Sequence, residues 1–243
     1  MKEIHRECAW RDRETVVKQE GLMNRFRTNL CLVWVIPALW LIMPVGVKMQ
    51  AAQPAASQQR VAYQLDPSRS RFEVRTSSGG VFRAFGHDHT IAVKDFSGTA
   101  EISPAALDQS SLKLKVKASS LSLSDPEVND KDRKEIEGTM RSQVLEVDRY
   151  PEILFTGTHV TARKISENEY EAKIEGDLQL HGVTRHEVIP AHLVIHENEL
   201  RAKGEFILKQ SDYAIKPVSA GGGTVKVKNE VKFSFEIIGV HRP

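Results

Sequence analysis

Strict alternation of apolar and polar residues over positions 170–180 allows this segment only one regular structure. Charged or polar residues fill the positions between the apolar ones, which are Tyr170, Ala172, Ile174, Leu178 and Leu180. A period of two residues is typical of a β-strand with one dry face and one wet face. His181 and Gly182 then interrupt the run, so we expect a turn that joins this strand to the next one.

The same alternation recurs from residue 61 onward. It predicts strands at residues 61–66, 71–76, 81–85, 90–94, 98–102, 112–118, 152–161, 169–180, 186–196, 200–209 and 225–238, with a kink near Ser97 and Gly98. Turn-forming residues separate these strands at short intervals, as they do in antiparallel hairpins. Residues 130–146 differ, because apolar residues recur there at helical spacing and predict one helix, at Ile136, Met140, Val144 and Leu145.

An antiparallel sheet of about eight strands must protect its two edges, and closure into a barrel removes them. We therefore predict an all-β fold, an antiparallel β-barrel of about eight strands with one helix. The inside of such a barrel is filled by side chains or holds one small ligand, which must be apolar here. The residues expected to line the barrel are Leu114, Val116, Phe155, Leu178, Leu180, Phe206, Leu208, Phe233 and Phe235.

The first part of the chain has the organisation of an export signal. Residues 30–47 form a long apolar run that follows Arg25 and Arg27 and precedes a stretch of small and polar residues. We expect residues 23–52 to be a signal peptide and residues 53–60 a linker. This predicts a periplasmic or secreted protein.

Two further expectations concern the same region. Residues 1–22 are polar and lie ahead of the signal, so we expect Met23 to be the true start and residues 1–22 to be a doubtful extension. The apolar run is near the length that spans a membrane, which leaves an anchor as the alternative. Pro37 and Pro44 argue against it, so no stable membrane insertion is expected after cleavage.

Charge and cysteine content exclude several classes of function. The formal net charge is +2, and the barrel region carries no basic stripe, so no nucleic acid partner is expected. Both cysteines, Cys8 and Cys31, precede the predicted barrel, which therefore contains neither a disulfide nor a catalytic thiolate. A nucleophile elbow is also missing, so we expect neither an enzyme nor a cofactor.

His87 and His89 give the sharpest alternative signal. Alternate residues of a strand point to the same side, so both imidazoles could face one metal ion. Zinc takes three or four protein ligands, and the sequence identifies no third one. A metal-binding protein or metal-dependent enzyme at these two residues is therefore an alternative, whereas His181 is expected to be a turn residue.

Three segments, residues 140–160, 170–190 and 203–217, resemble the YceI-like family. The motifs include Tyr150-Pro151 after the predicted helix and Leu180 to Arg185, and the resemblance covers residues 61–238. It implies a lipocalin-like barrel domain at residues 61–240, exported to the periplasm, with a polyisoprenoid or other long-chain lipid in an apolar tunnel. A secreted barrel that serves as a protein-interaction module is a further alternative, and a homodimer stays open.

Overall fold

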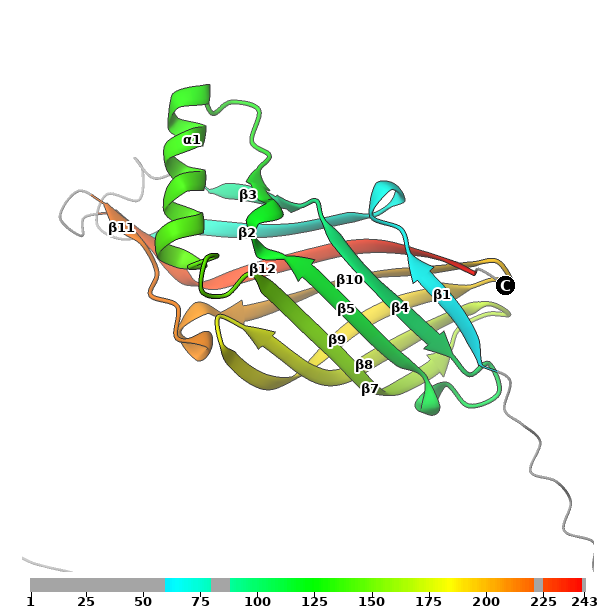
Figure 1. The fold of residues 1–243 in the computed structure, drawn as a ribbon. Helices are drawn as coiled ribbons and strands as arrows, with labels where there is room; N and C mark the ends of the chain where they lie inside the picture. Colours follow the sequence, from blue (N-terminus) through cyan, green and yellow to red (C-terminus); the bar gives the residue numbers. More distant parts are fainter. Residues whose placement is uncertain (1–59, 80–87, 221–224, 242–243) are drawn as a thin grey trace, which may run out of the picture. The chain divides into compact units, whose positions relative to one another are not determined.

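The computed structural model describes residues 60–79, 88–220 and 225–241. They form an antiparallel β-barrel with one helix, α1, at the end away from the C-terminus (Figure 1). The strands are β1 Val61–Leu65, β2 Arg71–Gly79, β3 His89–Val93, β4 Phe96–Ile102, β5 Ser111–Lys117, β6 Leu121–Leu123, β7 Glu152–Lys164, β8 Glu169–Leu180, β9 Val183–Ile195, β10 Glu199–Lys209, β11 Ser219–Ala220 and β12 Val225–His241. Residues 1–59, His87 and the strand expected at residues 81–85 lie outside the described residues.

Eight strands close the barrel. They follow the order β1-β4-β5-β7-β8-β9-β10-β12, and β12 pairs with β1 to complete the ring. All of these pairings are antiparallel. The predicted all-β, lipocalin-like barrel with one helix is therefore confirmed.

Three strands of the barrel wall are interrupted and then continue toward the helix end. Along the chain, β2 follows β1, β3 precedes β4 and β6 follows β5. β2 pairs with β12 and β3, and β3 pairs with β6. The break between β3 and β4 lies at Lys94 and Asp95, whereas the kink was expected near Ser97 and Gly98, two residues further along the chain. Its cause is a local bond, because the Asp95 N–H is donated to Ser120 Oγ at 3.1 Å instead of a neighbouring strand. Strand β6 was not expected.

Helix α1 spans Asp130–Thr139, and Asn129 caps it by accepting a hydrogen bond from the Asp132 N–H at 3.0 Å. The helix ends earlier than the predicted residue 146, because Met140–Val144 form a π-helical turn. Its wider ring is closed by the Leu145 N–H, which donates to the Met140 carbonyl at 2.9 Å. Met140 and Leu145 are both buried, whereas α1 itself contains no fully buried residue.

The alternation predicted for the strands is present, and a register shift in β7 changes the buried face locally. In β8 the apolar positions Ala172, Ile174, Leu178 and Leu180 are buried. In β7 the register with β8 shifts between Gly157 and His159, so Phe155 and Val160 are both buried although their positions differ by an odd number, five. No helix among the described residues is long and apolar enough to cross a membrane.

Candidate functional site

The barrel encloses an apolar cavity of about 220 Å³. Inward-facing side chains of nearly every barrel strand line it, and the predicted lining residues are all among them: Leu114, Val116, Phe155, Leu178, Leu180, Phe206, Leu208, Phe233 and Phe235. The strands bring these residues together because alternate side chains share one face of a sheet. That a ligand contacts them stays a prediction.

The lining residues extend along much of the length of the barrel. On β10 the lining residues run from Leu200 to Leu208, and eight steps of about 3.3 Å give about 26 Å along the strand. Polar lining residues are confined to the two ends, with Ser110 and Ser111 at one end and Thr76, Lys209 and Gln210 near the other. The middle is apolar throughout, so it offers a chain-like ligand dispersion and burial but no hydrogen bond.

A second cluster of buried side chains closes the end near the C-terminus. Tyr63, Ala100, Ile102 and Leu200 pack there and are each at most 6% exposed. The hydroxyl of Tyr63 donates to the carbonyl of His196 at 2.8 Å, which holds the β9–β10 loop against this cluster. Burial is the main reason that the pKa of Tyr63 is raised, and the charge of Glu197 adds to it.

The helix end of the cavity is covered by residues that sequence reasoning did not assign to the lining. Met140, Val144 and Leu145 reach it from the π-helical turn, and Tyr213 and Ile215 reach it from the segment after β10. The spacing of the first three predicted a helix but could not show which way that helix faces. Tyr213 and Ile215 lie outside regular strands, so no periodicity marked them.

Aromatic rings form one wall of the cavity. The ring of Phe206 stacks on that of Phe233 with centroids 4.8 Å apart and planes 11° apart. Phe72, which was not predicted to line the cavity, adds a third ring at 6.3 Å from Phe233. These rings provide a broad apolar face with few rotatable bonds.

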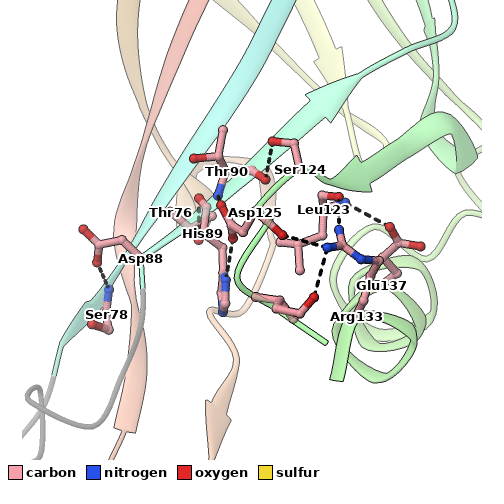
Figure 2. Close-up of polar contacts among 11 residues, drawn as sticks. Thr76, Ser78, Asp88, His89, Thr90, Leu123, Ser124, Asp125, Arg133 and Glu137 are labelled. Atoms are coloured by element: carbon pink, nitrogen blue, oxygen red, sulfur yellow. Dashed lines mark hydrogen bonds and ion pairs between the residues drawn. The ribbon is translucent and has the colours of Figure 1, made fainter. Parts of the chain in front are cut away.

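His89 takes part in a hydrogen-bonded network that holds β3 to the segment leading into α1 (Figure 2). Its Nδ1 atom lies 2.9 Å from Oδ2 of Asp125, whose Oδ1 accepts from the Thr90 N–H at 3.0 Å. Within the described ranges, no three His, Cys, Asp or Glu side chains gather as a metal site requires. His87, the other candidate ligand, lies outside those ranges.

The same network ties the helix to β6. Arg133 donates to the carbonyl oxygens of Leu123, Asp125 and Val128 at 2.5, 2.7 and 3.1 Å, and Glu137 accepts from the Leu123 N–H at 3.0 Å. Both side chains belong to α1, so two helical turns are fixed to the barrel rim (Figure 2). The arrangement positions the helix and contains no acid–base pair aimed into the cavity.

The expected turn at His181 and Gly182 is confirmed. Both residues have positive φ, 52° and 75°, as a tight hairpin turn requires. The imidazole of His181 lies 3.2 Å by Nδ1 from the carbonyl oxygen of Tyr213 and 3.4 Å by Nε2 from a Glu146 carboxylate oxygen. The ring of Tyr150 lies 4.4 Å from that of His181, so this histidine joins three segments at the helix end.

Comparison with known proteins agrees with this architecture. The chain matches the model of the YceI-like domain over residues 63–238, and no curated protein matches it. The structure is similar to a polyisoprenoid binding domain from Saccharophagus degradans, with a TM-score of 0.56 and 16% identity, over 75% of this chain and 99% of that one. It is also similar to BcnA of Burkholderia cenocepacia, with a TM-score of 0.54 and 17% identity, over 72% of this chain and 98% of that one.

At these identities the two solved structures share the fold with this chain, while the family model extends over most of its length. The motifs around Tyr150-Pro151 and His181-Gly182 lie within the matched residues. They form the turn and ring contacts that close the helix end of the barrel. The chain therefore belongs to the YceI-like domain family.

Proposed function

We propose that this protein binds a polyisoprenoid or similar long apolar chain in the barrel and that it is not an enzyme. The observation that carries the proposal is the elongated cavity, whose middle is lined by aliphatic and aromatic side chains alone. The name of the Saccharophagus degradans neighbour, a polyisoprenoid binding domain, supports the same ligand class. Ligand binding would be driven by burial of about 0.8 kcal/mol per CH₂ group.

Branched isoprenoid chains suit this cavity because their methyl groups need width as well as length. The stacked rings of Phe206 and Phe233 present a flat wall, and branched aliphatic side chains line the facing strands. Any polar head group would lie at an end of the cavity, because the polar lining residues are found there.

Retinol, a fluorescent isoprenoid alcohol, is a direct probe of this proposal. We expect the purified domain to bind it with one site per chain, and we expect lipid extracted from the protein to contain chains built of five-carbon units. A protein that carries no lipid and takes up neither retinol nor an isoprenoid from a membrane extract would refute the proposal.

We also propose that the protein is exported, since residues 23–52 have the organisation of a signal peptide. Expression of the full chain followed by mass spectrometry of the mature form tests this. An N-terminus between Ala51 and Ala56 is expected, and retention of Met1 in the mature protein would refute both export and the start at Met23.

A further inference from the structure

The wall of the barrel is incomplete between β9 and β10. The two strands pair only at four positions, from Ile195 with Leu200 to His192 with Lys203. By contrast, β9 pairs with β8 from Val183 to Val194, and β10 pairs with β12 over its full length. Toward the helix end, β9 and β10 therefore each keep one neighbour and lose the backbone ladder between them. We call this part of the wall the seam and define it by Val183–Ile189 and Glu205–Lys209.

Pro190 explains why the ladder stops where it does. A Cβ atom placed on Gly204 would lie 2.3 Å from the Pro190 carbonyl oxygen, so this oxygen faces β10. In an antiparallel strand, the N and O atoms of one residue face the same neighbour. An ordinary residue at position 190 would donate its N–H to β10, but proline has none. The close approach of Pro190 to Gly204, just beyond the last paired residues, therefore marks the hinge end of the seam.

Two cross-strand pairs of the seam, next to the hinge end, are apolar on both sides of the wall. In the register of the paired part, Val188 would lie opposite Ile207 and Ile189 opposite Phe206. Ile189 and Phe206 line the cavity. Val188 and Ile207 face outward and are 48% and 61% exposed, and only one other large hydrophobic side chain of the described residues, Ile165, is comparably exposed. An apolar path thus leads from the surface to the cavity.

Side chains replace the missing ladder beyond these pairs. The hydroxyl of Tyr213 donates to Glu187 Oε1 at 2.6 Å, and Nη1 of Arg185 donates to the Asp212 carbonyl at 3.3 Å. These two bonds connect β9 to the turn that follows β10. They can break and form again without disturbing the pairing of β9 with β8 or of β10 with β12.

Among the described strands, β6 and β7 also lack a ladder between them, and that place is built differently. β6 does not pair with β7, and buried residues of the π-helical turn, Met140 and Leu145, pack at that end of the barrel. Arg133 and Glu137 additionally fix α1 to β6. That opening is closed by a bonded and packed helix, whereas the seam is held by side-chain bonds to the turn after β10 and has exposed apolar side chains.

We propose that an apolar chain enters and leaves the cavity sideways through the seam, by separation of β9 and β10 about Pro190 and Gly204. This proposal rests on the proposed function and adds the route and its latch, the Tyr213–Glu187 bond. Passage between Val188 and Ile207 keeps the chain in contact with apolar side chains from the surface to Phe206. The helix end does not have to unfold.

Cross-linking the seam tests the route. The described residues contain no cysteine, so Val188→Cys with Ile207→Cys introduces two thiols, which are joined by oxidation or, where the sulfurs do not meet, by the short reagent dibromobimane. The matched control is Val194→Cys with Arg201→Cys, an outward pair of the same two strands in the part that is already laddered. Retinol association and dissociation are followed by stopped-flow fluorescence before and after cross-linking.

We expect the seam cross-link to slow both rates by about tenfold or more and the control cross-link to leave them within about twofold. Tyr213→Phe, which keeps the ring and removes the latch, should speed both rates. The proposed route would be refuted, and the proposed function left intact, if retinol association and dissociation rates changed neither with the seam cross-link nor in Tyr213→Phe. A wild-type protein that binds no retinol or other isoprenoid would refute the proposed function, and the route with it.

Discussion

The bond between Tyr213 and Glu187 makes a quantitative prediction about stability. Tyr213 is fully buried, and its hydroxyl donates to a half-buried carboxylate at 2.6 Å. Hydrogen bonds to charged groups contribute about 1.5–3 kcal/mol to stability. Tyr213→Phe keeps the packing of the ring, and water can reach the released carboxylate. We therefore expect the free energy of unfolding at pH 7 to fall by about 1.5 kcal/mol, the lower end of that range.

The assay is urea unfolding followed by far-UV circular dichroism, because the three tryptophans all lie before residue 41 and the barrel lacks this fluorophore. The midpoint should fall by about 0.5–1 M urea with an unchanged slope. Tyr170→Phe is the control, since within the described residues the Tyr170 hydroxyl makes no hydrogen bond. A loss below about 0.5 kcal/mol for Tyr213→Phe, or an equal loss in the control, would refute the reasoning.

The pH dependence provides a second signature of the same bond. Burial, and next the hydrogen bond to Glu187, raise the pKa of Tyr213. In the unfolded chain the pKa is about 10, so above that pH the unfolded state releases a proton that the folded state keeps. This contribution to stability is fully present below about pH 10 and is lost as the pH rises further. The stability difference between wild type and Tyr213→Phe should therefore shrink between pH 8 and pH 11, and a difference that grows would contradict the assignment.

Four further predictions concern other residues of the barrel and helix. Gly182→Ala should lower the free energy of unfolding by at least about 1–2 kcal/mol, because φ is 75° there and a Cβ atom would lie 2.6 Å from Cε1 of Tyr150. Gly138 lies in α1, and nothing lies within 4 Å of its Cβ position, so Gly138→Ala should raise the free energy of unfolding by about 0.5–1 kcal/mol. Urea titrations of the two glycine variants should therefore show changes in stability of opposite sign. Arg133→Met should speed tryptic cleavage at Lys131 and Lys134 in the helix, while cleavage at Lys173 in β8 stays constant. Equal rates of helix cleavage in the wild type and the variant would contradict the role of Arg133 in fixing α1. Ala202→Phe should fill part of the 220 Å³ cavity and weaken retinol binding about tenfold, whereas Lys203→Phe on the outer face should leave the fluorescence titration unchanged.

Alternation alone predicted much of the barrel. The bounds of β8 agree with the predicted residues 169–180, and Leu178 and Leu180 line the cavity as expected. The lysines of β5, Lys113, Lys115 and Lys117, face outward for the same reason. A period of two depends only on neighbouring residues, so the sequence carries it locally and tertiary contacts rarely change it.

The missed features depend on contacts between distant parts of the chain. Alternation shows which face of β9 is buried but not that its pairing with β10 stops at His192. Pro190 is the residue that could have indicated this, because proline inside a predicted strand signals an edge. The π-helical turn at Met140–Val144 had no such signal, since the same apolar residues fit an ordinary helix.

The seam also divides the barrel into regions of unequal local stability. Amides of Val183–Ile189 that face β10 have no strand to bond to, whereas those near Ile195 and Leu200 lie in a ladder beside the buried Tyr63 cluster. Local opening that exposes the amides of the seam costs little free energy. Opening of the ladder near Ile195 and Leu200 requires global unfolding. In native-state hydrogen exchange, the amides of β9 near the helix should therefore exchange through local fluctuations, at a rate that does not depend on denaturant. The amides of β9 near the C-terminus should exchange only when the whole barrel unfolds. A single strand would thus belong to two cooperative units.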